Sequence, residues 1–519
     1  MTAEAIQSSS SVSTKKEEGN DQSNLFSNAV ILELNEKFRP FLALKRSEAL
    51  LDWDLEVNMP EAGSESRGFI MGQLALLDQR HIADLYPILD TVASKTRELN
   101  DYERGVVRIL EYYRKYYTRI PASLLEEEKK VAVQSTVVWR KARKKSDYKS
   151  FEPYLERIIE IKLKEAEKLG YERYPYDALL DLYEEQLTVE DMDHMFSRLI
   201  PALRKILEKA RSEKRFVSEH PLEHEPYETE SLIRVNKKLT EILGLPKDRF
   251  RMDVSTHPFM TNISRDDVRI TTRYEGKDFA RSAYGTIHES GHAIYELQLD
   301  PSLEYTPIGT AASTGFHESQ SRFWENFVGR SRAFVALTSP MLKTELKFLA
   351  QYSDEDLFQY FNLVRPSMIR VEADELTYNF HIALRYELEK KLLAGSVKVG
   401  ELPMIWNDYM EDYLGIRPKD DSEGVLQDIH WSSGGLGYFP TYSLGNIIAG
   451  MIWYNMRSDI SDLDNLVRSG DFSPIKAWLY QRIHRFGATF PPKELAEKSL
   501  VEAFNPDRLI EYLEWKYLS

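Results

Sequence analysis

Apolar residues three and four positions apart recur along most of this 519-residue chain, and this spacing constrains its fold more than any other feature. In residues 189–212, for example, Met192 and Phe196 lie one helical turn apart on the same face. Proline should interrupt one helical run at Pro40 and kink or split the run of residues 189–212 at Pro201. Similar runs cover residues 101–117, 123–146, 154–169, 315–332, 354–364, 369–393 and 446–456. The pattern predicts a mainly α protein.

One short stretch has the alternation of a β-strand instead. Val268, Ile270 and Thr272 alternate with polar or charged neighbours, as in a strand with one buried face. The next segment, residues 280–299, is again helical in pattern. We therefore expect a small β-sheet immediately before this helix.

The N-terminal segment has a different composition from the rest. Residues 1–28 are rich in Ser, Lys and Glu, and such a segment buries too little apolar surface to offset its ordering entropy. We expect a disordered polar tail over residues 1–28. Residues 29–519 contain no further linker-like segment, so they are interpreted as one large helical domain.

Composition excludes several classes of partner and site. The formal net charge is −15, from 83 acidic and 68 basic residues, which disfavours nucleic acid or an anionic membrane as a partner. With no cysteine, any metal must be bound by His, Asp or Glu. No segment has the length and apolarity of a membrane span or a secretory signal, so a cytoplasmic location is expected.

The segment 280–299 carries the strongest chemical motif. His288, Glu289 and His292 form HExxH, and on a helix the two histidines lie one turn apart on the same face. Two imidazoles can then bind one metal ion, while Glu289 reaches the water at an open metal position. A third donor must come from elsewhere. Glu318 in the following helical run is a candidate, and His317 and Glu325 are its rivals.

Six motifs, in order along the chain, resemble those of the carboxypeptidase Taq family of metallocarboxypeptidases. They are HPF at 257–259, DVRIT at 267–271, HESGH at 288–292, HESQ at 317–320, IRVEAD at 369–374 and GVLQDIHW at 424–431. The resemblance extends from about residue 50 to the C-terminus. It implies a helical domain with a deep active-site cleft, Glu318 as third ligand, a homodimer, and peptide substrates with a free C-terminus. Around Ala488, where that family has a basic residue, the chain departs from the pattern.

Such a reaction needs a general base and an anchor for the substrate carboxylate. Glu289 is the expected base, and it later protonates the leaving amine. Arg370 is the first choice of anchor because a planar guanidinium binds a carboxylate through two hydrogen bonds. Asp374, predicted one helical turn later, would orient it. Arg269 is the alternative anchor.

The remaining expectations concern residues around the substrate. Tyr438, Tyr442 and His430, in or near a glycine-rich loop, are candidate donors to the oxyanion. His257, held extended by the proline that follows it, is predicted to line the cleft. Gln427 and Asp428 are expected to support His430 or a metal-binding imidazole from behind.

Two choices stay open at this point. Two histidines and a glutamate suit zinc, although cobalt and manganese accept the same ligands. The alternatives to a carboxypeptidase are a related helical metallopeptidase that releases dipeptides or cuts internal bonds, and a metal-binding scaffold without catalysis.

Overall fold

Helices dominate the computed structural model, which describes residues 25–519. The first half of the chain contains α1 (Ala29–Val57), α2 (Ser64–Ala83), α3 (Tyr86–Ala93), α4 (Asp101–Arg119), α5 (Ala122–Lys145), α6 (Tyr148–Leu169), α7 (Pro175–Asp181), α8 (Val189–Glu213) and α9 (Thr229–Ile242). The second half contains α10 (Phe279–Leu297), α11 (Thr314–Arg322), α12 (Arg332–Glu345), α13 (Asp354–Phe361), α14 (Tyr378–Leu393), α15 (Leu402–Leu414), α16 (Pro440–Asp459), α17 (Leu463–Ser469), α18 (Ser473–Arg482), α19 (Pro492–Leu500) and α20 (Pro506–Leu518). The predicted mainly α class is confirmed.

Two long helices run through the prolines that were expected to interrupt them. α1 continues through Pro40 and α8 continues through Pro201. Both prolines lie on the exposed side of their helix, where water can satisfy the carbonyl that loses its partner. Burial of the opposite face, including Phe41 in α1 and Leu203 in α8, keeps each helix continuous. The interruption predicted at Pro40 is therefore wrong, and α8 is not split at Pro201.

The helix predicted over residues 369–393 begins only at Tyr378. A short 3₁₀ turn, Arg370–Glu372, precedes it. The carboxylate of Asp374 accepts hydrogen bonds from the backbone N–H groups of Leu376 and Thr377, at 2.9 and 3.0 Å. An aspartate that bonds its own backbone in this way competes with helix formation. The residues between Arg370 and Tyr378 are thus not one turn of a helix.

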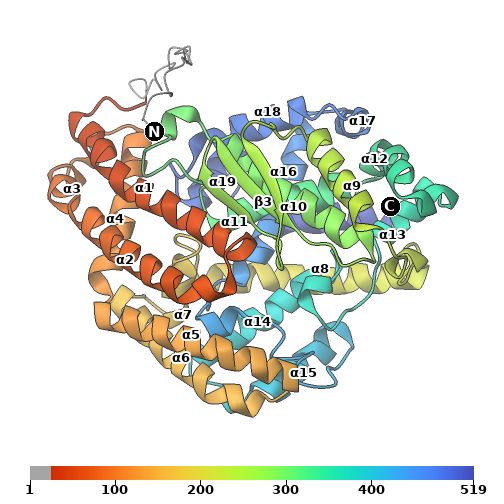
Figure 1. Cartoon of the computed structure of the whole chain (residues 1–519), viewed down its shortest axis with the longest axis horizontal. Helices are drawn as coiled ribbons and strands as arrows, with labels where there is room; N and C mark the ends of the chain where they lie inside the picture. The colour runs from red at the N-terminus through yellow and green to blue at the C-terminus, as the bar shows by residue number, and fades with distance from the viewer. Residues whose placement is uncertain (1–24) are drawn as a thin grey trace, which may run out of the picture.

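A three-stranded sheet supports the helix that carries HExxH (Figure 1). It consists of β1 (Phe250–Val254), β2 (Met260–Ser264) and β3 (Asp267–Thr272), in the order β1-β3-β2. β3 pairs in parallel with β1 and antiparallel with β2. Val268 and Ile270 are fully buried, as the alternation predicted. α10 packs on β2 and β3, which gives this helix a rigid base.

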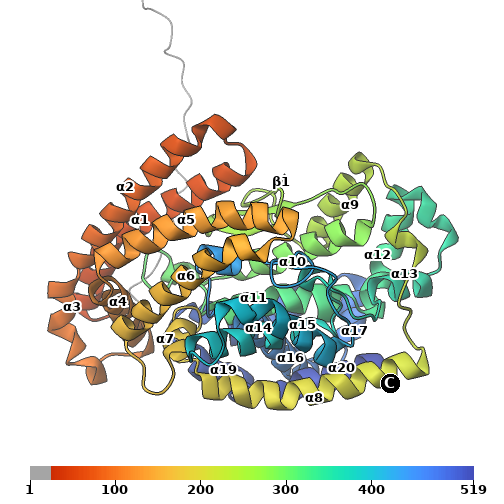
Figure 2. The same ribbon diagram turned by 90° about the horizontal axis from the view of Figure 1, so that it is seen from below.

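The buried apolar residues form two clusters. A smaller one lies among α1 to α4 and includes Phe26, which is 1% exposed although it falls within the tail predicted over residues 1–28. The rest of that predicted tail, residues 1–24, lies outside the described residues. A larger cluster joins the remaining helices, with α10, α11 and α16 packed together near its centre (Figures 1 and 2).

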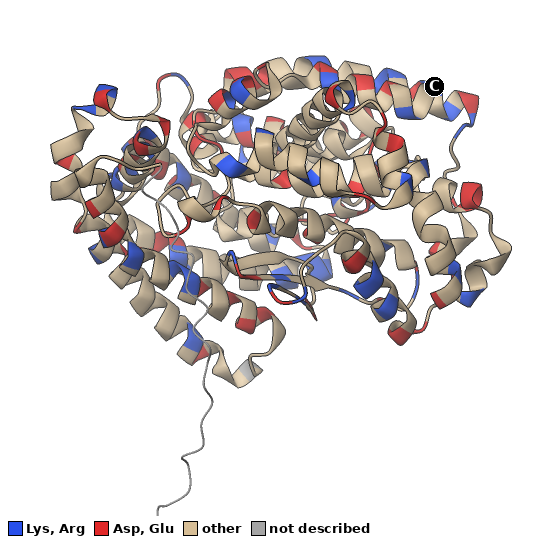
Figure 3. Ribbon diagram, turned by 90° about the horizontal axis from the view of Figure 1, so that it is seen from above, with Lys and Arg blue, Asp and Glu red and all other residues tan. Residues whose placement is uncertain are grey.

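Charged residues of both signs are interspersed over the helices (Figure 3). In the basic run at the end of α5, Arg140, Lys141 and Lys144 are exposed to solvent, while Trp139 and Ala142 are buried. It is one face of an amphipathic helix. Within residues 25–519, no helix has both the length and the apolarity needed to cross a membrane.

Candidate metal centre

Three side chains from two neighbouring helices converge at one point. His288 and His292 project from the same face of α10, and Glu318 projects from α11. Their ligand atoms all lie within 4.8 Å of one another. Within residues 25–519 no other trio of His, Asp or Glu side chains meets this closely.

Both histidines present the same ring nitrogen to Glu318. Nε2 of His288 lies 3.7 Å, and Nε2 of His292 3.5 Å, from Oε2 of Glu318. The other carboxylate oxygen, Oε1, accepts a hydrogen bond of 2.7 Å from Nε of Arg322. Burial by itself would raise the pKa of Glu318, but Arg322 and His288 hold that pKa well below its usual range. Glu318 is therefore an anion with one oxygen turned to the two imidazoles.

Each imidazole is oriented from behind by a second side chain. Nδ1 of His288 lies 2.9 Å from Oε2 of Glu325, which is also paired with Arg330. A carboxylate on the far nitrogen fixes the ring orientation and leaves Nε2 free to bind a metal. Glu325, a rival for the third ligand, is thus placed to orient a ligand. It lies in a π-helical turn, Phe323–Gly329, that continues α11.

His317, the other rival, lies behind His292. The two rings stack with their centroids 4.4 Å apart, and their Nδ1 atoms are separated by 2.5 Å. Nε2 of His317 in turn lies 3.1 Å from Oε1 of the buried Glu296. Burial and the neighbouring His317 lower the pKa of His292 to about 3, so its ring is neutral at physiological pH. A neutral imidazole is the form that binds a metal.

Two glycines allow the three helices of the centre to approach closely. A Cβ at Gly291 would lie 2.6 Å from the carbonyl oxygen of Gln320, and one at Gly445 would lie 2.6 Å from Cγ of Glu318. Both distances are shorter than van der Waals contact. Gly291 therefore brings α11 against α10, and Gly445 brings α16 against the side chain of Glu318.

Glu289 lies beside the trio and is 7% exposed. Burial raises the pKa of Glu289 to about 7, and His288 partly offsets this effect. A carboxyl group with a pKa near neutrality can both accept and return a proton at physiological pH. This is the property that the predicted base requires.

A second buried group is centred on Arg370. Nε and one terminal nitrogen of Arg370 donate to Oδ1 of Asp428, at 3.1 and 2.9 Å, and its other terminal nitrogen donates to the hydroxyl of Tyr378. Arg385 of α14 donates to the second oxygen of Asp428, and Gln427 accepts hydrogen bonds from both arginines. Two guanidinium groups thus share one carboxylate.

This arrangement changes the roles expected for three residues. Asp374 was predicted to orient Arg370, but the chain is not helical between them and its carboxylate bonds the backbone instead. Gln427 and Asp428 were expected behind an imidazole, and they hold Arg370 and Arg385. Arg385 was missed because nothing in its own helix distinguishes it from other arginines. Its 0% exposure is visible only in the folded chain.

The aromatic candidates lie between these two groups. Tyr442 belongs to the first turn of α16 rather than to the loop, and the guanidinium of Arg370 lies 5.0 Å from the centre of its ring. Its hydroxyl is 3.4 Å from Nε2 of His430, and His430 stacks on Tyr438 with centroids 5.5 Å apart. Burial lowers the pKa of His430 to about 4.

The last two candidates are placed differently. Arg269 binds the carboxylate of Asp267 through two hydrogen bonds of 2.7 Å and lies over the ring of Trp53, 4.4 Å from its centre. These contacts tie the sheet to α1. His257 is exposed on the loop between β1 and β2, where its carbonyl accepts a hydrogen bond from Ser255.

A mainly helical fold in which two histidines and a glutamate converge from α10 and α11 fits the class of metallopeptidases. Comparison with known proteins identifies the family within that class. A model of the carboxypeptidase Taq (M32) metallopeptidase family matches residues 33–517. The chain is 45% identical to Thermostable carboxypeptidase 1 of Pyrococcus furiosus, over 95% of this chain and 99% of that protein. It is 36% identical to Carboxypeptidase 1 of Bacillus subtilis, over 90% and 94%.

A solved structure agrees with these matches. The Pyrococcus furiosus carboxypeptidase superposes with a TM-score of 0.93 at 44% identity, covering 95% of this chain and all of the other. The chain therefore belongs to the carboxypeptidase Taq (M32) family, and it is a metal-dependent carboxypeptidase. The resemblance inferred from the six motifs is confirmed.

Proposed function

We propose that His288, His292 and Glu318 bind one divalent metal ion and that Glu289 is the catalytic base of the carboxypeptidase reaction. The observation that carries this proposal is the convergence of two Nε2 atoms and one carboxylate oxygen within 4.8 Å. Two imidazoles and a carboxylate form a donor set found in catalytic zinc sites, with a position left for water.

The charges around the trio also suit a cation. Glu289, Glu318 and Glu325 carry up to three negative charges, and the partly buried Arg322 and Arg330 supply two positive ones. The imidazole of His292 is neutral, and His288 would also be neutral as a metal ligand, so neither would add charge to a loaded site. A divalent ion bound there would acidify a water molecule and polarise the scissile carbonyl.

Glu289 then moves the proton. Its carboxylate takes a proton from the attacking water and delivers it to the nitrogen of the leaving amino acid. Its buried position and raised pKa favour both steps, since neither protonation state is strongly preferred near pH 7. Burial and the charge of Glu318 contribute to the raised pKa of both Tyr438 and Tyr442, which supports either as the proposed donor to the oxyanion.

Arg370 is proposed to bind the free carboxylate of the substrate. Arg370 and Arg385 together carry two positive charges against the single negative charge of Asp428. A buried cluster with one positive charge in excess attracts an anion strongly. Tyr378 and Tyr442 flank Arg370, and Tyr378 also lies under Arg322, which binds Glu318. This contact connects the proposed anchor to the metal site.

Two measurements test the assignment together. Glu289→Gln should keep its metal and lose turnover by roughly 10²–10⁴-fold, the usual contribution of a general base. Peptides with an amidated C-terminus should be cut far more slowly than the matched free acids. A Glu289→Gln variant that retains full turnover would exclude Glu289 as the base, and equal cleavage of amidated peptides would exclude a carboxylate anchor.

Three finer points belong to the same proposal. Zinc is the expected metal because of its preference for nitrogen and oxygen donors in tetrahedral sites, with cobalt and manganese as alternatives. A homodimer follows from the family resemblance, and a cytoplasmic location from the composition. Metal analysis, light scattering and cell fractionation test them in turn.

A further inference from the structure

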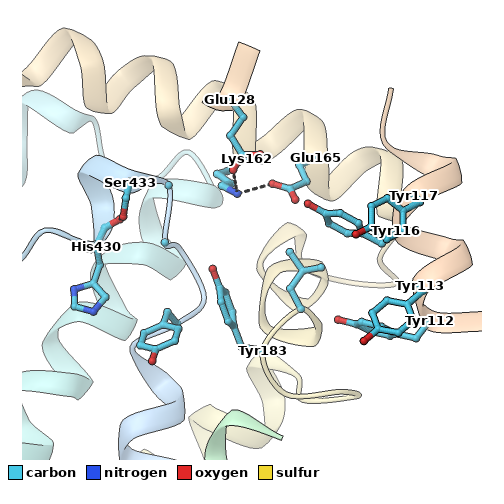
Figure 4. A pocket seen from close by; sticks show the side chains of 14 residues that line it. Tyr112, Tyr113, Tyr116, Tyr117, Glu128, Lys162, Glu165, Tyr183, His430 and Ser433 are labelled. Atoms are coloured by element: carbon cyan, nitrogen blue, oxygen red, sulfur yellow. Dashed lines mark hydrogen bonds and ion pairs between the residues drawn. The ribbon is translucent and has the colours of Figure 1, made fainter. Parts of the chain in front are cut away.

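A cavity of about 590 Å³ opens beside His430 and Tyr438. Its walls come from α4, α5, α6 and the loop that follows His430 (Figure 4). One wall is a double row of tyrosines on α4, where two pairs of rings stand one helical turn apart: Tyr112, Tyr113, Tyr116 and Tyr117. Tyr183 and Tyr438 add two more rings. The surface is thus largely aromatic, and the proposed reaction uses none of the four tyrosines of α4.

The remaining wall carries a buried ion triplet. The ammonium of Lys162 lies between the carboxylates of Glu128 and Glu165, 2.7 Å from the latter (Figure 4). The side chains of Lys162 and Glu165 are 7% and 2% exposed, whereas that of Glu128 is 21% exposed and faces the cavity. One ammonium balances one carboxylate. The triplet therefore keeps one negative charge, and Glu128 is its accessible member.

No other lining side chain neutralises this charge. His430 has its pKa lowered to about 4 by burial, so it is uncharged at neutral pH. The remaining lining residues are tyrosines, leucine, serine and glycines. Tyr116 lies near Glu128 and Glu165, whose charges together with burial raise the pKa of its hydroxyl. A carboxylate surrounded by tyrosine rings attracts a cation in two ways, through its charge and through the negative faces of the rings.

Two residues that line the cavity, Tyr438 and His430, also neighbour residues of the proposed site. Tyr438 lines the cavity and contacts Tyr183 edge to face, with centroids 5.2 Å apart. Burial and the charge of Glu318 raise the pKa of the same Tyr438. His430 lines the cavity on one side and meets the hydroxyl of Tyr442, beside Arg370, on the other. These shared neighbours connect the cavity to the proposed substrate-binding residues.

We propose that this cavity is a subsite for a positively charged group of the peptide substrate, with Glu128 as its ionic partner and the tyrosines of α4 as its walls. The proposal rests on the carboxypeptidase function and adds a substrate preference to it. The cation has two possible sources in a peptide, the side chain of a lysine or arginine and the free amine of the N-terminus. An extended peptide advances about 3.3 Å per residue, so either source would be recognised at a defined distance from the scissile bond.

The test uses the full-length metal-loaded enzyme and two sets of peptides, of which only the first has a constant length. In the first set, acetylated peptides carry lysine or its neutral analogue norleucine at successive positions. In the second set, the same norleucine peptides carry a free or an acetylated N-terminus and differ in length. The measured quantity is kcat/KM for release of the C-terminal residue by wild type, Glu128→Gln, Tyr116→Leu and Glu127→Gln.

Glu127→Gln is the matched control. Glu127 neighbours Glu128 on α5, but it pairs with Arg157 and does not line the cavity. Glu128→Gln keeps the size of the side chain and leaves Lys162 paired with Glu165, so folding should be retained. Tyr116→Leu removes a ring without changing the charge, and it provides a second route if the first variant is unstable.

In wild type, lysine at one position, or a free N-terminus at one peptide length, should raise kcat/KM by roughly tenfold over the neutral peptide. This is the size expected of a charge-assisted contact. Glu128→Gln should abolish this preference, Tyr116→Leu should reduce it and Glu127→Gln should retain it, with kcat/KM on the neutral peptides unchanged. A preference in the acetylated set identifies a side chain, and one confined to the second set identifies the N-terminal amine.

The proposal is overturned if wild type prefers neither cation, or if Glu128→Gln slows neutral and cationic peptides equally. Turnover of the neutral acetylated peptides by wild type tests the carboxypeptidase function separately, so the two failures are distinguishable.

Discussion

The centre on α10 and α11 and the arginine group around Asp428 both lie inside the protein. The centre has fewer arginines than carboxylates, whereas the arginine group has fewer carboxylates than arginines. Around His288 and His292, three carboxylates face two arginines. Around Asp428, one carboxylate faces two arginines. An uncompensated charge is costly in a protein interior. The first region is therefore suited to a cation and the second to an anion, as a metal ion and a substrate carboxylate would supply.

The two regions also differ in how they are assembled. The two histidines and Glu289 lie within one helical turn, and Glu318 and Glu325 follow in the next helical segment. Arg370, Arg385 and Asp428 come from a 3₁₀ turn, from α14 and from an irregular segment. A site built on neighbouring helix turns is readable from spacing, whereas one built from distant segments depends on packing. The predictions below address this difference, in order of decreasing effect.

The largest effect should come from removing the carboxylate that faces both imidazoles. Glu318→Ala should weaken metal binding by more than the roughly 10–100-fold typical of a ligand's outer partner. The physical reason is loss of one of three donors together with the negative charge nearest the metal. Metal content after dialysis against a chelator measures it. Full occupancy in this variant would transfer the third position to His317 or Glu325.

Removing the proposed anchor should affect substrate but not metal. Arg370→Ala should lower kcat/KM on peptides with a free C-terminus by roughly 10–100-fold, since a hydrogen bond to a charged group contributes about 1.5–3 kcal/mol. Asp428 keeps Arg385 as its partner, so the fold should survive. Arg269→Ala is the control, because Arg269 pairs with Asp267 beside Trp53. If the control loses activity and Arg370→Ala does not, the anchor is Arg269.

A smaller effect is expected from the carboxylate behind His288. Glu325→Gln should weaken metal binding by about tenfold, at the low end for such partners, because the amide still accepts a hydrogen bond from Nδ1 but carries no charge. Competition with a chelator measures the affinity. Glu296→Gln, one residue further removed behind His317, should change it less. The reverse order would show that His292 depends on its outer partner more than His288 does.

The smallest effect should come from the helix contact at Gly445. Gly445→Ala places a methyl group 2.6 Å from Cγ of Glu318, and overpacking of this kind costs about 1–3 kcal/mol. We expect a lower melting temperature and a slightly weaker metal site. Gly285→Ala on α10 is the control, since its added methyl meets open space and should be neutral or stabilising. Equal melting temperatures for the two variants would contradict the close approach.

The errors of sequence interpretation have a common physical origin. Pro40 was expected to interrupt a helix and Pro201 to kink or split one, but both face solvent and burial of the other side keeps each helix continuous. The segment from Arg370 to Asp374 was predicted to be helical. The carboxylate of Asp374 instead accepts hydrogen bonds from backbone N–H groups, and the helix begins only at Tyr378. In each case a tertiary or side-chain interaction outweighed a local preference.

The sequence by itself determined the helical character of the chain and the pairing of His288 with His292, because both follow from the 3.6-residue turn of a helix. Resemblance to a family added Glu318. Only the tertiary structure decided which side chains orient the two imidazoles, which carboxylate holds Arg370, and how Glu128 and Lys162 come to face Tyr116. These contacts join residues far apart in the chain, and no spacing rule relates such residues before the core has packed.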